Sequence, residues 1–131
     1  MTASTPTLTA GQLALLRWAS LATAVGAFVQ LLTGGYNFTA DQPLVTAHIV
    51  VGILTIAFAA IATIAAFVNR SKGGNSGLAF HVLGTLIFIV IQYAIGTAYL
   101  STMFHMAFGV LILISAIAMT TLAFRKPLAR P

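Results

Sequence analysis

The sequence predicts an all-α integral membrane protein, a bundle of four transmembrane helices built from two repeated helical hairpins. Composition is the first observation: 60% of the 131 residues are hydrophobic and 5% are charged, whereas a soluble domain carries roughly a quarter charged residues. The second is that the apolar residues form four long segments, and the third is that every basic residue lies on one side of them. A chain with so little polar surface requires lipid as its solvent.

The four apolar segments cover about residues 11–34, 44–68, 77–99 and 102–124, within a single domain that spans residues 1–131. Each segment is long enough, at about 1.5 Å of rise per residue, to cross a hydrocarbon core of about 30 Å. Only Leu100 and Ser101 separate the third segment from the fourth, so we expect these two helices to be antiparallel neighbours.

Local signals mark the ends of these segments. Thr9 and Gln12 have the spacing of a capping box, in which two side chains satisfy free amide groups at a helix start. The run Gly34–Asn37 predicts a turn after the first helix, and Pro43 suits the first turn of the second. Ser76 follows a polar, glycine-rich loop and is the expected N-cap of the third helix.

The charges predict an orientation in the membrane. In the four-span arrangement one side carries all of the basic residues, which are Arg17, Arg70, Lys72, Arg125, Lys126 and Arg130. The single acid, Asp41, falls on the other side. By the positive-inside rule we expect both termini to be cytoplasmic. The expected location is the plasma membrane. The expected partners are the lipid bilayer and other respiratory-complex subunits or further copies of the chain, and not nucleic acid.

Two histidines have matching surroundings and predict a cofactor. His48 lies near the start of the second segment with Gly52 four residues later, and His105 lies near the start of the fourth with Gly109 four residues later. Both enter the membrane from the outer side, and two facing imidazoles are a common ligand set for haem iron in a helical bundle. We therefore expect His48 and His105 to be the metal ligands of one haem b. The glycines, on nearly the same helix face, leave room for the macrocycle.

The first and third segments carry a second matching pattern. Gln30 and Gly34 occur in the first, and Gln92 and Gly96 occur at the same spacing in the third. The repeat predicts two hairpins related by an approximate two-fold axis along the membrane normal. Ligating histidines usually give their second N–H to an acceptor, and we expect Gln30 and Gln92 to take that role in the cofactor site.

Other residues fit the chemistry of a metal site less well. His81 has no histidine at its own depth, so a structural role is expected for it. A copper site from Met103, His105 and Met106 is disfavoured. On a helix His105 projects about 100° from Met106 and about 200° from Met103, so the three side chains cannot converge on one ion. Histidines in a membrane span also form hydrogen bonds between helices, which leaves a haem-free scaffold or accessory subunit as an alternative.

The run I-Q-Y-A-I-G…F-H-M-A-F-G-V-L at Ile91–Leu111, with histidines at the outer start of the second and fourth spans, resembles one half of the haem A synthase family in its half-length, archaeal-type form. The resemblance implies haem-ligand roles for His48 and His105. The family's catalytic half has a glutamate and often an arginine where this chain has Val45 and Ile49, and its loop cysteines are missing.

Three functions follow from these patterns. The first is electron transfer by a membrane b-type haem protein, as a small subunit of a respiratory complex, because two histidines saturate the iron. The second, implied by the resemblance, is a half-length haem A synthase acting on haem O, with Asp41 or a partner chain replacing the absent groups. The third is the haem-free scaffold. Whether the chain is an enzyme is left open by its sequence.

Overall fold

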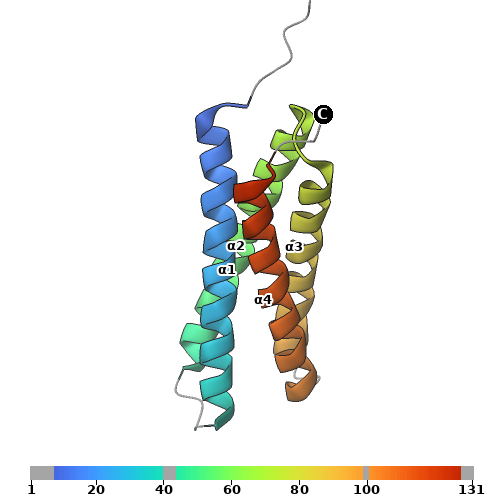
Figure 1. Cartoon of the computed structure of the whole chain (residues 1–131). Helices are drawn as coiled ribbons and strands as arrows, with labels where there is room; N and C mark the ends of the chain where they lie inside the picture. Colours follow the sequence, from blue (N-terminus) through green and yellow to red (C-terminus); the bar gives the residue numbers. More distant parts are fainter. Residues whose placement is uncertain (1–7, 40–43, 99–100, 128–131) are drawn as a thin grey trace, which may run out of the picture.

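The computed structural model describes residues 8–39, 44–98 and 101–127, and these ranges contain four long helices and no strand. The helices are α1 (Ala10–Thr39), α2 (Val45–Ser71), α3 (Ser76–Thr97) and α4 (Thr102–Arg125). They run up and down in turn, so that consecutive helices are antiparallel (Figure 1). Each helix packs against two others, in the ring α1–α2–α3–α4 and back to α1. Within the described ranges α2 and α4 are therefore diagonal, as are α1 and α3.

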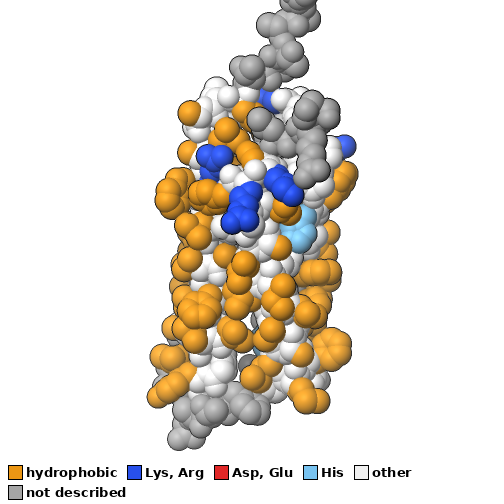
Figure 2. All heavy atoms as spheres, in the orientation of Figure 1, with side chains coloured by type: hydrophobic (Ala, Val, Ile, Leu, Met, Phe, Trp, Pro, Cys, Tyr) orange, Lys and Arg blue, Asp and Glu red, His pale blue; other side chains and the backbone are white. Residues whose placement is uncertain are grey.

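All four helices are long and apolar enough to cross a membrane, which confirms the predicted four-helix architecture and indicates a membrane protein. Large apolar side chains are exposed on every helix, including Phe28, Ile64, Phe80 and Leu111. Figure 2 shows such side chains along the length of the visible face. Soluble proteins rarely expose an apolar surface of this extent to water, whereas a lipid bilayer solvates such a surface favourably.

The first helix is longer than its sequence predicts. α1 continues through Gly34 and Gly35 to Thr39, so the turn expected over residues 34–37 is wrong. Glycine weakens a helix by only about 1 kcal/mol, and here Gly34 faces a side chain of α2 at close range. α2 also continues past the predicted end to Ser71, because Asn69 and Arg70 stay helical. From composition, polar residues at the end of an apolar segment predict a loop, but here the helix continues through them.

The helix caps agree with the sequence in one case and differ in another. The capping box is confirmed: the Thr9 amide donates to Gln12 Oε1 at 3.1 Å, and the Gln12 amide donates to Thr9 Oγ1 at 3.2 Å. The cap of α3 is Asn75 and not Ser76, because the Asn75 side chain accepts from the Leu78 amide at 3.2 Å. Asn and Ser fill this position equally well, so composition does not choose between neighbours.

Buried side chains are confined to one half of the bundle, which we call the closed half: residues 10–27, 55–71, 76–89 and 112–125. Its core is rich in alanine, which lets the helices approach closely. The remaining helical residues, 28–39, 45–54, 90–97 and 102–111, form the open half. None of the side chains described there is buried. In Figure 1 the α1–α2 hairpin and the α3–α4 hairpin diverge toward this end.

The basic residues gather at the end of the closed half. Among the described residues they are Arg17, Arg70, Lys72, Arg125 and Lys126, which lie near the start of α1 and at the ends of α2 and α4. Figure 2 shows Lys and Arg side chains clustered at this end of the visible face. Asp41, Pro43, Leu100 and Arg130, which entered the sequence predictions, lie outside the described residues.

Candidate functional site

Both predicted ligands lie in the open half and face each other across the bundle. His48 is in the first turn of α2, and His105 is in the first turn of α4, the diagonally opposite helix. The centres of the two imidazole rings are 6.1 Å apart, and the ring planes are inclined at 66°. Both side chains are partly buried. The structure thus brings together two residues that are 57 positions apart in the sequence (105 − 48).

Each histidine is held by a glutamine of the preceding helix, but through its backbone. The Gln30 side-chain amide donates to the His48 carbonyl oxygen. The Gln92 amide donates to the His105 carbonyl oxygen at 2.6 Å. These glutamines were expected to accept the second imidazole N–H, whereas in the structure their side-chain amides donate to the histidine carbonyls. The same donor–acceptor pair occurs in both hairpins, so the hydrogen bond joins α1 to α2 and α3 to α4 at one level of the bundle.

Four glycines make these contacts possible. A Cβ atom on Gly52 would lie 3.4 Å from Gln30 Nε2, and one on Gly109 would lie 3.2 Å from Gln92 Nε2. The two glycines named from the sequence therefore make room for the glutamines. A Cβ on Gly34 would lie 3.1 Å from His48 Cε1, and one on Gly96 would lie 2.7 Å from His105 Cε1. Gly34 and Gly96 thus seat the imidazoles against α1 and α3.

Sequence reasoning missed this seating role, although the Gln-x-x-x-Gly spacing of the first and third helices was the signal for it. Glutamine and glycine four residues apart share a helix face. The neighbouring helix therefore meets both together, with its histidine against the glycine and its own glycine against the glutamine.

The two imidazoles differ in their hydrogen bonds. His48 Nδ1 lies 2.9 Å from the Thr33 hydroxyl oxygen. His105 Nδ1 is buried and makes no hydrogen bond to any described residue, and Gln92 Oε1 is in the same condition. Ile95 stands three residues after Gln92, as Thr33 stands three after Gln30, so the second hairpin has no hydroxyl at this position. No sequence signal marked Thr33, because a threonine in an apolar helix is ordinary.

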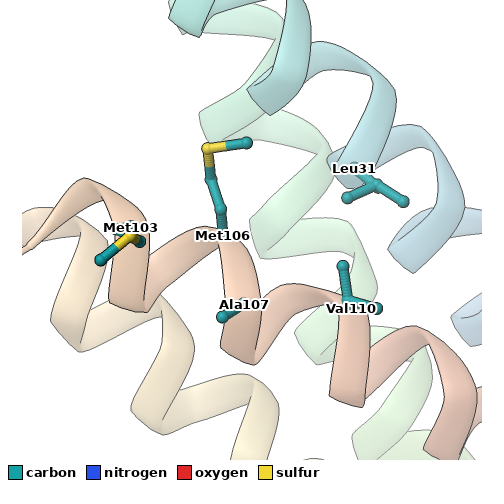
Figure 3. A pocket seen from close by; sticks show the side chains of 5 residues that line it. All are labelled: Leu31, Met103, Met106, Ala107 and Val110. Atoms are coloured by element: carbon teal, nitrogen blue, oxygen red, sulfur yellow. The ribbon is translucent and has the colours of Figure 1, made fainter.

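An apolar pocket of about 340 Å³ opens between α1 and α4 in the open half, and neither His48 nor His105 is among its lining residues. Figure 3 shows Leu31 on α1 and four lining side chains on α4, which are Met103, Met106, Ala107 and Val110. Met103 lines this pocket and is 82% exposed, which gives no support to a copper site with His105. No three His, Cys, Asp or Glu side chains come together in the part of the chain that the structure describes.

His81 lies in the closed half, apart from the other two histidines. Its Nε2 donates to the Ser115 carbonyl oxygen of α4 at 3.1 Å. The Thr85 hydroxyl donates to the His81 carbonyl oxygen at 2.9 Å and contacts the Ser115 hydroxyl at 2.8 Å. This arrangement joins α3 to α4 and fits the structural role expected for His81.

No protein-family model, curated protein or solved structure matches the chain. The resemblance to one half of the haem A synthases therefore stays a prediction. Where that family has a glutamate and an arginine, Val45 and Ile49 are exposed on the surface of α2, at 37% and 46%.

Proposed function

We propose that the chain is a membrane b-type haem protein in which His48 and His105 are the axial ligands of one haem. The observation that carries the proposal is the spacing of the rings, with centres 6.1 Å apart. A metal ion lies about 2 Å from a ligating imidazole nitrogen, and the ring centre lies about 1 Å further, so two rings on opposite sides of one metal have centres about 6 Å apart. The two rings stand at this separation.

The packing around the histidines supports the same assignment. The open half has no buried side chain among its described residues, so its packing is looser than that of the closed half. Phe108, which packs against the buried cluster of the closed half, forms an edge-to-face pair with Phe88 at 5.5 Å between ring centres. These rings provide an apolar floor between the site and the closed half. Gly34 and Gly96 allow the imidazoles to sit back against α1 and α3.

The matching contacts of the two hairpins support an internal duplication. Gln30 and His48 in the first hairpin, and Gln92 and His105 in the second, make the same side-chain to backbone hydrogen bond. An approximate two-fold axis along the membrane normal relates them in our proposal. With the basic end in the cytoplasm, both termini are inside, and the haem lies near the outer face of the plasma membrane.

When bound, haem supplies a one-electron iron couple. The chain's own residues hold both imidazoles at a fixed separation and surround them with apolar helices that limit access of water. Two histidine ligands favour transfer of electrons over reaction with oxygen. We therefore assign the chain to electron transfer, as a small subunit of a respiratory complex or as a homo-oligomer in the bilayer.

A spectrum of the purified protein tests this function. The reduced-minus-oxidised spectrum of the detergent-solubilised chain is expected to show low-spin haem b at one per chain. His48→Ala and His105→Ala are each expected to abolish the low-spin signal. His81→Ala is the matched control and keeps it, because His81 lies in the closed half. A low-spin spectrum retained in both ligand variants contradicts the assignment. Haem A in cells that also express a haem O synthase would identify a synthase.

A haem-free scaffold is the second candidate, and one observation favours it. The His48 and His105 rings already make an edge-to-face contact, and each backbone carbonyl already accepts a glutamine amide. These contacts link the helices without a cofactor. In this case the purified chain has no haem spectrum with added haem b, and His48→Ala lowers its melting temperature.

A further inference from the structure

The hydrogen bonds of Thr33 favour one of the two tautomers of His48. The Thr33 hydroxyl lies 2.9 Å from the Val29 carbonyl oxygen and 3.3 Å from that of Gln30. We assign the single hydroxyl proton to the helix backbone, an arrangement that both carbonyl distances allow. The Thr33 oxygen therefore accepts from His48, whose Nδ1 lies 2.9 Å away. With its proton on Nδ1, neutral His48 has a free electron pair on Nε2.

His105 has no equivalent partner. The residue at the position of Thr33 in the second hairpin is Ile95, whose side chain neither donates nor accepts. His105 Nδ1 is buried without a hydrogen bond to the described residues. Nothing in the described site therefore fixes the tautomer of this ring, although the glutamine contact and the seating glycine are the same in both hairpins.

We propose that the two histidines are unequal ligands, with Thr33 as a positioning residue that makes His48 the permanent ligand and leaves His105 as the exchangeable one. This inference rests on the haem function proposed above. When the imidazole nitrogen that does not bind the metal donates a hydrogen bond, that bond fixes the ring orientation and raises the basicity of the ligating nitrogen. Loss of such a bond typically weakens metal binding about 10- to 100-fold. A small ligand such as carbon monoxide would then take the place of His105 on the ferrous iron.

Single-ligand variants provide the first test. His105→Ala keeps only His48, and His48→Ala keeps only His105. We expect the first to bind haem b about 10- to 100-fold more tightly than the second, as five-coordinate high-spin haem. Adding Thr33→Val to His105→Ala removes the advantage, whereas Thr33→Ser, which restores a hydroxyl, retains it. Ile95→Thr added to His48→Ala supplies the missing hydroxyl and strengthens haem binding.

Two measurements on the otherwise intact chain accompany these variants. Carbon monoxide should bind the reduced wild type with loss of low-spin character, and Ile95→Thr should weaken that binding. In the haem-free protein, ¹⁵N NMR of the imidazoles should show His48 with its proton on Nδ1, and this preference should be lost in Thr33→Val. The NMR readout reports the tautomer directly and does not depend on haem loading.

The outcomes separate this inference from the function on which it rests. If the wild type binds no haem, the proposed function fails, and the ligand roles fail with it. If the wild type binds haem but the two single-ligand variants bind it equally tightly, and Thr33→Val changes neither, the inequality is overturned and the function stands. A His48 ring with its proton on Nε2 in the haem-free protein overturns the inequality as well.

Discussion

The closed and open halves of the bundle are both mainly apolar, but they are packed differently. In the closed half Leu16, Leu78 and Met119 are wholly buried among alanines, and hydrogen bonds such as His81 to Ser115 join the helices. In the open half no described side chain is buried, and the polar groups Gln30, His48, Gln92 and His105 face the interior. The comparison shows that tight side-chain packing is confined to one end of the bundle. One end holds the helices together, and in our proposal the other end binds the cofactor.

The largest effect should come from a cavity in the closed half. Met119→Ala removes a side chain that is 0% exposed and is expected to destabilise the protein by about 2–5 kcal/mol. Met103→Ala is the matched control on the same helix, because Met103 is 82% exposed in the open half, and it should change stability by less than about 0.5 kcal/mol. Thermal unfolding in detergent measures both. Equal losses would mean that the two halves are packed alike.

The second-largest effect should be the stabilisation of the open half by bound haem. A ligand present at 100 times its dissociation constant stabilises the folded state by about 2.7 kcal/mol. We expect added haem b to raise the melting temperature and to increase protection from hydrogen exchange in residues 45–54 and 102–111, with little change in the closed half. His48→Ala, which binds haem more weakly, should show both effects to a smaller extent. If haem b increased protection from hydrogen exchange only in the closed half, the open half would not be the haem site.

The seating glycines should give a smaller, graded effect on the site. A Cβ on Gly96 would lie 2.7 Å from His105 Cε1, and one on Gly34 would lie 3.1 Å from His48 Cε1, whereas one on Gly35 meets nothing within 4 Å. Gly96→Ala should displace the His105 ring at a cost of about 1–3 kcal/mol and lower haem affinity. Gly34→Ala should do less, and Gly35→Ala should leave the spectrum unchanged. A haem titration that ranks the three variants in another order would refute the seating role.

Part of the candidate site was predictable, because some of its signals are local. His48 and His105 with a glycine four residues later, and Gln30 and Gln92 at matching depth, were visible as a repeated pattern. The partner of each group was not visible. Gln30 and Gln92 reach the histidine carbonyls, and Thr33 reaches His48 Nδ1, because of how α1 and α3 are rotated against their neighbours. Helix rotation depends on packing between segments and has no local signal.

The amino-acid sequence alone determined the number of helices, their approximate bounds, the capping box at Thr9 and the gathering of the basic residues at one end. These properties depend on residues close together in the chain, because apolar length and capping are local. The tertiary structure alone decided that α1 continues past Gly34, that one half is closed and the other open, and that Thr33 serves only one histidine. The helices are apolar on nearly all sides, so hydrophobicity does not distinguish a face that meets lipid from one that meets another helix.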